Sequence, residues 1–177
     1  MIIAMAALSL AACASRPKPL GPAATNSTPP APEAPYAPPP TPGAVTESPG
    51  APIPGSVRDF VINAGDRVYF DYDSDALRPD ASPVLEAQSS WLNRYPDVRV
   101  RVEGNCDERG TEAFNFALGA RRAEAVKNFL VEHGVSPGRI QTVSYGKERP
   151  IDPGHDEAAW AKNRNAVTDI TGGARGE

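Results

Sequence analysis

The sequence contains very little cysteine: Cys13 and Cys106 are the only two among 177 residues. Two cysteines cannot form the framework of several disulfides that stabilises many small secreted domains. If Cys13 is modified, as its surroundings indicate below, Cys106 has no partner and the fold needs no disulfide. The cellular compartment must therefore be inferred from targeting signals.

An excess of basic residues is also absent. The chain has 18 Lys and Arg against 22 Asp and Glu, a net charge of −4. Proteins that bind the nucleic-acid backbone need a basic footprint. The composition therefore argues against a nucleic-acid partner.

The N-terminal apolar run, residues 1–12, is too short to span a bilayer as a helix. It is typical of the hydrophobic region of a secretory signal peptide. Small residues followed by Cys13 fit the bacterial lipobox, in which the cysteine is linked to diacylglycerol and becomes the mature N-terminus. Lys and Arg are missing from the first five residues, so the true start is open and could lie upstream of Met1. The alternative is a buried N-terminal segment.

Proline is concentrated in one segment: 14 of the 20 prolines lie between Arg16 and Pro54. Residues 13–55 have almost no large apolar side chains, so they cannot bury enough surface to offset the entropy of ordering. We expect the lipidated cysteine followed by a disordered tether, which would span roughly 120 Å as a polyproline helix. A docking peptide for a partner's aromatic groove is the alternative.

The remaining residues, 56–172, are predicted to form one domain, and residues 173–177 a disordered tail. Alternating apolar and polar residues or β-forming runs predict strands at 67–70, 98–103, 140–145 and 166–170. Helical spacing predicts helices at 80–95, 112–133 and 156–163. Residues 56–64 remain unassigned. The order β-α-β-α-β-(α)-β with a half-exposed mixed four-stranded sheet indicates an α+β fold, a two-layer sandwich.

The long helix interrupts its own apolar stripe with two polar side chains, Asn115 and Arg122. A buried guanidinium is costly unless it is paired. Asp107 precedes the helix, and helical side chains lean toward the helix N-terminus, so we expect Arg122 to pair with Asp107. The pair could form a polar pocket or a purely structural contact at the edge of the core.

Several kinds of catalytic and metal site would need residues that this sequence does not provide. The acidic run Asp71–Asp75 lacks the glycine and the distal glutamate of a Ca²⁺ loop, so no metal is expected. A peptidase built on Cys106 would need a base, and only His133 and His155 are available, neither placed near it by the sequence. No cofactor is indicated. A hydrolase that uses two carboxylates remains the enzymatic alternative.

Residues 104–111, with Asn115, Leu118, Arg122 and Val126, resemble the peptidoglycan-binding signature of outer-membrane-protein-A-like (OmpA-like) domains. Residues 143–150 and 154–160 narrow the resemblance to the peptidoglycan-associated lipoproteins. It extends over roughly residues 68–167 and involves several motifs in order. It implies an OmpA-like domain that is not an enzyme.

The resemblance implies a ligand, the meso-diaminopimelate of the peptidoglycan stem peptide, whose distal end carries an ammonium and a carboxylate. Asp107 and Asp73 would accept hydrogen bonds from the ammonium, and Arg122 would bind the carboxylate. The implied peptidoglycan-binding residues are Tyr72, Asp73, Asp107, Arg109, Gly110, Thr111, Asn115, Leu118 and Arg122.

The other implied site residues have smaller roles. Tyr72 matches an aromatic residue that lines the family's pocket, and Arg109 lies on its rim. Gly110 and Thr111 would offer backbone N–H groups at a helix N-terminus, although Thr111 is also explained as an N-cap alone. Asn115 would bridge to the ligand, and Leu118 would pack against its methylene groups.

The same resemblance implies a lipoprotein of the Gram-negative outer membrane, with its domain in the periplasm and TolB and other Tol-Pal proteins as partners in envelope integrity and cell division. Ala14 after the cysteine agrees with sorting to the outer membrane. A general OmpA-like wall-binding module without Tol partners is the alternative.

Three positions depart from the family pattern. Asn165 stands where a basic residue is common, Asp169 interrupts the apolar run of the last strand, and Cys106 occupies a position where Thr or Ala is frequent. We expect the C-terminal edge of the domain to be frayed, with residues 171–177 unstructured.

Overall fold

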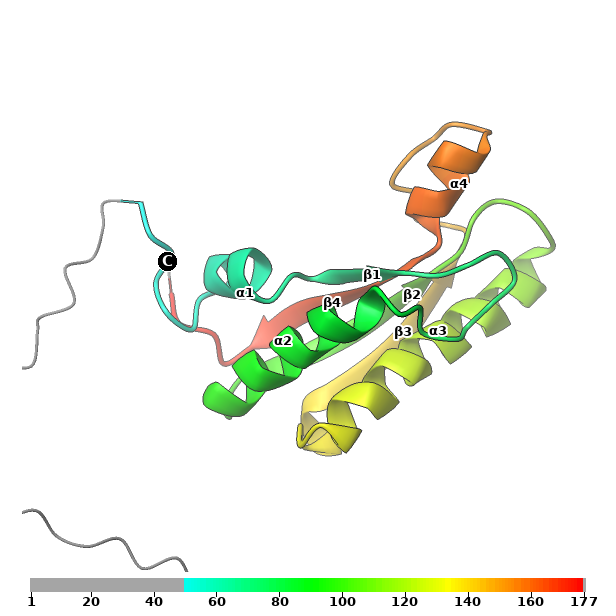
Figure 1. Ribbon diagram of the computed structural model, residues 1–177. Coiled ribbons are helices and arrows are strands. Elements are labelled where there is room, and N and C mark those ends of the chain that lie inside the picture. The colour runs from blue at the N-terminus through cyan, green and yellow to red at the C-terminus, as the bar shows by residue number, and fades with distance from the viewer. Residues whose placement is uncertain (1–49, 177) are drawn as a thin grey trace, which may run out of the picture. The chain divides into compact units, whose positions relative to one another are not determined.

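The computed structural model describes residues 50–176 (Figure 1). The predicted signal peptide, the predicted lipidation site Cys13 and most of the predicted tether lie outside the described residues. Within residues 50–176, no helix has the length and apolar character needed to cross a membrane.

The four predicted strands are present and form one mixed sheet. They are β1 (Arg67–Tyr69), β2 (Arg99–Asn105), β3 (Ile140–Gly146) and β4 (Asn165–Gly172). The strand order is β1-β4-β2-β3, with β4 antiparallel to both neighbours and β2 parallel to β3. The predicted α+β class and mixed four-stranded sheet are confirmed.

The two longest helices pack on one face of this sheet. The helices are α1 (Val57–Asn63), α2 (Ala81–Arg94), α3 (Glu112–Glu132) and α4 (Glu157–Asn163), with a 3₁₀ turn η1 at Pro137–Arg139. The two long helices, α2 and α3, lie side by side and cover the sheet, which gives the expected two layers (Figure 1). The unassigned segment at 56–64 is α1, capped where the Ser56 hydroxyl accepts a hydrogen bond from the Asp59 amide at 3.1 Å.

The position of the hydrophobic core follows from the alternation of apolar and polar residues along β2. Val100 and Val102 are buried, whereas Arg99 and Glu103 lie on the opposite, wetter face. The buried valines meet apolar residues of the two long helices, namely Leu85, Leu92, Ala123, Val126 and Leu130. This packing fixes α3 above β2.

A pair of glycines brings α3 unusually close to β2. A Cβ on Gly104 would clash with the carbonyl oxygen of Gly119, and a Cβ on Gly119 would lie 2.8 Å from the carbonyl oxygen of Gly104. Only glycine at both positions permits this separation. The close approach sets the position of the first half of α3 relative to the carboxyl end of β2.

The expectation of a frayed C-terminal edge is wrong. Strand β4 lies inside the sheet, between β1 and β2, and continues through Gly172. Asp169 is tolerated because its side chain lies on the wetter face, where its carboxylate accepts a hydrogen bond from Arg101 Nη2 at 2.9 Å. The chain beyond β4 is also held, because the Arg175 amide donates to the carbonyl oxygen of Gly55 at 2.9 Å. The predicted disordered tail is therefore wrong at Arg175, and the folded unit includes Gly55.

Candidate functional site

A small pocket opens at the carboxyl end of β2, where the β1–α2 loop, the β2–α3 loop and the start of α3 meet. The cavity measures about 80 Å³. Its lining residues are Tyr72, Asp73, Cys106, Asp107, Arg109, Gly110, Phe114, Asn115, Leu118, Arg122 and Arg164. Eight of the nine residues predicted from the sequence line it, and Thr111 does not.

Arg122 forms the buried polar floor of this pocket, with 0% of its surface exposed. Its guanidinium donates to the carbonyl oxygens of Ser74 at 2.8 Å, Asn105 at 2.8 Å and Asp71 at 3.0 Å. A guanidinium has five N–H groups. These three hydrogen bonds leave one N–H on each of its two terminal nitrogens.

The predicted ion pair between Arg122 and Asp107 is wrong. Backbone carbonyls of the β1–α2 loop and of the end of β2 satisfy the guanidinium instead. Burial lowers the pKa of Arg122, while the nearby Cys106 and Asp107 oppose that shift. An arginine starts from so high a pKa that it stays charged. The pocket floor is therefore a cation without a carboxylate bonded to it.

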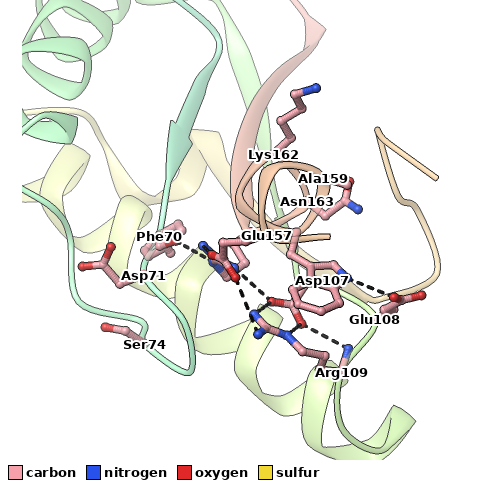
Figure 2. Close-up of polar contacts among 12 residues, drawn as sticks. Phe70, Asp71, Ser74, Asp107, Glu108, Arg109, Glu157, Ala159, Lys162 and Asn163 are labelled. Atoms are coloured by element: carbon pink, nitrogen blue, oxygen red, sulfur yellow. Dashed lines mark hydrogen bonds and ion pairs between the residues drawn. The ribbon is translucent and has the colours of Figure 1, made fainter. Parts of the chain in front are cut away.

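Asp107 is bound by two other arginines. Its carboxylate accepts hydrogen bonds from Arg109 Nη2 at 2.6 Å and Nε at 3.2 Å, and from Arg164 Nη1 at 3.3 Å (Figure 2). Burial raises the pKa of Asp107, but the hydrogen bonds from Arg109 and Arg164 outweigh burial and hold the pKa below its ordinary value. Asp107 is thus an ionised, fully engaged carboxylate in the pocket wall.

Three lining residues, Cys106, Phe114 and Arg164, were not among the predicted site residues, and Arg164 is the one that bonds to Asp107. It is 6% exposed and donates to the carbonyl oxygen of Phe70 at 3.1 Å and to Glu157 at 2.7 Å, besides its contact with Asp107. It comes from the junction of α4 and β4, far from Asp107 in the sequence. An arginine directly before a predicted strand was the available signal.

Arg109 lies on the rim, as expected, between two aromatic rings. Its guanidinium carbon is 4.1 Å from the ring centroids of both Tyr72 and Trp160. Trp160 is itself held by Glu108, which accepts from its indole N–H at 2.9 Å and contacts His155 Nδ1 at 2.8 Å. Contacts with His155 and Trp160 lower the pKa of Glu108. These contacts connect the β1–α2, β2–α3 and β3–α4 segments around the pocket mouth.

Asp73 offers a second carboxylate at the mouth. It is exposed, lines the pocket and has a φ of +49°, a backbone conformation that residues other than glycine rarely adopt. Within residues 50–176, no hydrogen bond or ion pair of the structure engages the Asp73 carboxylate. Strained backbone of this kind concentrates at functional sites.

The β2–α3 loop and the first turn of α3 are held by local hydrogen bonds. Thr111 caps α3, because its hydroxyl accepts from the Phe114 amide at 3.2 Å. Asn115 donates its side-chain amide to the carbonyl oxygen of Arg109 at 2.8 Å, so it fixes the loop that carries Gly110, whose φ is +92°. The structure gives Thr111 its capping role and places it outside the pocket lining.

Cys106 and Asn165 have structural contacts at this end of the sheet. The Cys106 thiol donates to the carbonyl oxygen of Asn115 at 3.3 Å, and burial raises its pKa against the effect of the nearby Arg122. Asn165 is fully buried and accepts from the Asn105 side-chain amide at 3.0 Å. No group of His, Cys, Asp and Glu in the described part of the chain could hold a metal ion.

The pocket places opposite charges at separate points. Arg122 presents N–H donors at the floor, Asp73 presents acceptor oxygens at the mouth, and Leu118 is an apolar residue of the lining. Such an arrangement suits a small zwitterion, whose carboxylate and ammonium need partners of opposite sign.

The chain matches known proteins along most of this domain. The model of the OmpA family matches residues 69–164. A peptidoglycan-associated lipoprotein from Mesorhizobium japonicum is 51% identical over 123 residues, covering 70% of this chain and 73% of the relative. One from Haemophilus influenzae is 51% identical over 100 residues, covering 56% of this chain and 65% of the relative.

Solved structures agree with these matches. The crystal structure of the peptidoglycan-associated lipoprotein from Burkholderia pseudomallei has a TM-score of 0.58 and 42% identity, covering 59% of this chain and 89% of that one. The C-terminal domain of MotB from Helicobacter pylori has a TM-score of 0.57 and 27% identity, covering 60% of this chain and 84% of that one.

Proposed function

Because the chain belongs to the OmpA family, and within it to the peptidoglycan-associated lipoproteins, we propose that its pocket binds peptidoglycan without a covalent bond through the meso-diaminopimelate of the stem peptide. The distal end of this residue is a zwitterion. Its carboxylate would meet the free N–H groups of Arg122, and its ammonium would meet Asp73. The Asp107 carboxylate, which lies in the wall of the pocket, would add negative potential that favours the ammonium.

The observation that carries this proposal is the state of Arg122. It is a buried cation whose protein partners are three backbone carbonyls, not a carboxylate. These neutral acceptors leave the positive charge of Arg122 uncompensated by a bonded carboxylate, and one N–H on each terminal nitrogen remains without a bond. A buried cation with two such N–H groups in a pocket favours a ligand carboxylate, which can accept from both.

The wider role follows from the family. We propose that lipid on Cys13 anchors the chain in the outer membrane, that residues 13–55 act as its tether, and that the domain binds the wall in the periplasm. The chain would act without catalysis, with TolB and other Tol-Pal proteins as partners in envelope constriction at cell division. The curated relatives are named as peptidoglycan-associated lipoproteins, which supports the proposals that this chain binds the cell wall and carries a lipid anchor.

Co-sedimentation with purified sacculi tests the pocket. The detergent-solubilised full chain is expected to pellet with sacculi that contain diaminopimelate. Arg122→Lys keeps the charge but cannot satisfy three carbonyls and still offer two N–H groups, so we expect at least about tenfold weaker pelleting. Wild-type pelleting by this variant would contradict the proposal.

The neighbouring arginine provides a matched control. Arg121 has a half-exposed side chain and contacts Asp75 at 3.8 Å, outside the pocket. Arg121→Lys should pellet like the wild type. Circular dichroism of both variants checks that the fold is retained, so that lost binding is not mistaken for lost structure.

A further inference from the structure

Phe114 stands at the pocket mouth without an assigned role. It lines the cavity, yet 45% of its surface is exposed. Its ring carbon Cδ1 lies 3.4 Å from the point where a Cβ on Gly110 would sit, so the ring rests against the glycine of the β2–α3 loop. Exposed aromatic surface beside a polar cavity is available for a ligand's apolar part.

The size of the cavity requires a larger ligand to continue outside it. A volume of about 80 Å³ is well below that of pockets that enclose whole drug-sized molecules. It has room for the charged head of one amino acid. A stem peptide whose diaminopimelate head enters the pocket would therefore run across the mouth, where Phe114 lies.

We infer that Phe114 is a specificity residue that contacts the alanine next to the diaminopimelate, so that the site prefers the stem peptide to the free amino acid. The inference rests on the proposed function. Alanine is chosen because its methyl group is the apolar group that flanks the diaminopimelate, whereas the other neighbour brings a carboxylate. The exposed phenyl ring of Phe114 can pack against a methyl group, but it offers no hydrogen bond to a carboxylate.

A second phenylalanine provides a matched control. Phe116 is 59% exposed and follows Phe114 by two positions, which turns it about 200° around α3. It does not line the cavity. Phe116→Ala removes the same group from the same helix without touching the mouth.

Calorimetric titration of the detergent-solubilised full chain tests the inference with two ligands, free meso-diaminopimelate and the tetrapeptide L-Ala-γ-D-Glu-meso-diaminopimelate-D-Ala. The wild type should bind the tetrapeptide more tightly. Phe114→Ala should reduce this preference by about fivefold to tenfold, the effect of losing one well-packed aromatic contact. Phe116→Ala should keep the wild-type preference.

The two ligands separate the failure of this inference from that of the proposed function. If the wild type binds both ligands and Phe114→Ala keeps the full preference, or Phe116→Ala loses it equally, the inference is overturned and the proposed function stands. The inference is also overturned if the wild type binds both equally. If the wild type binds neither, the proposed function fails and the inference fails with it.

Discussion

Asp107 and Arg122 are two buried ions in one pocket, and each is hydrogen-bonded by a different kind of partner. Asp107 is held by Arg109 and Arg164, whereas Arg122 is held by backbone carbonyls. The two arrangements have different consequences. The carboxylate contributes a pH-dependent part of the domain's stability, and the guanidinium keeps its charge throughout.

Asp107→Asn should show this pH dependence. The pKa of Asp107 is lowered in the folded state, so its stabilisation is fully present above the unfolded value of about 3.9 and is lost as pH falls through the lower folded pKa. We expect the variant's free energy of unfolding to be lower than the wild type's by about 1–3 kcal/mol near neutral pH. Urea unfolding at several pH values measures the difference.

The control for this variant is an exposed carboxylate at the opposite end of β2. Asp97→Asn should change the free energy of unfolding by less than about 0.5 kcal/mol. A difference between Asp107→Asn and the wild type that stays constant down to about pH 2 would contradict the ionised, hydrogen-bonded state of Asp107.

Among structural elements, α3 determines the pocket, because it carries Asn115, Leu118 and Arg122 on one face. Its position depends on the glycine contact with β2. Gly119 therefore matters to the site although it does not line the cavity.

Gly119→Ala tests this dependence. Alanine normally stabilises a helix by about 1 kcal/mol relative to glycine. Here its Cβ would meet the Gly104 carbonyl oxygen at 2.8 Å and the Ser144 hydroxyl still closer, so we expect a net destabilisation of about 1–3 kcal/mol. Thermal or urea unfolding gives the sign directly.

Gly138→Ala in η1 is the matched substitution, because nothing lies within 4 Å of its Cβ position. It should be neutral or slightly stabilising. A stabilising effect of Gly119→Ala would show that α3 can move away from β2 at no cost.

The elements themselves follow from local patterns in the sequence. The alternation of Val98, Val100 and Val102 and the cap at Thr111 depend on near neighbours, so strand and helix positions could be predicted. That Asp169 is tolerated in β4 could not be predicted, because this depends on its contact with Arg101, which is 68 positions away in the sequence.

The same limit applies to the site. The residues of the β2–α3 segment were predictable because they belong to one continuous motif. The partners of Arg122 could not be predicted, since they are backbone carbonyls, two of them in a separate loop, and carry no side-chain signal. Arg164 was missed because only the fold brings the α4–β4 junction to Asp107.

At the scale of the whole molecule, the domain is proposed to hold the cell wall through a single zwitterionic group. The described domain has one face of helices and a pocket at the carboxyl end of β2. On the proposed function, attachment to the cell wall would depend mainly on the chemistry of one residue in each stem peptide and not on a large surface.

Sacculi of two kinds test this claim most directly. Lysine in place of diaminopimelate keeps the distal ammonium but lacks the carboxylate that Arg122 would bind. We predict that the full chain pellets with diaminopimelate sacculi and at least about tenfold less with lysine sacculi of similar cross-linking. Equal pelleting with both would contradict it.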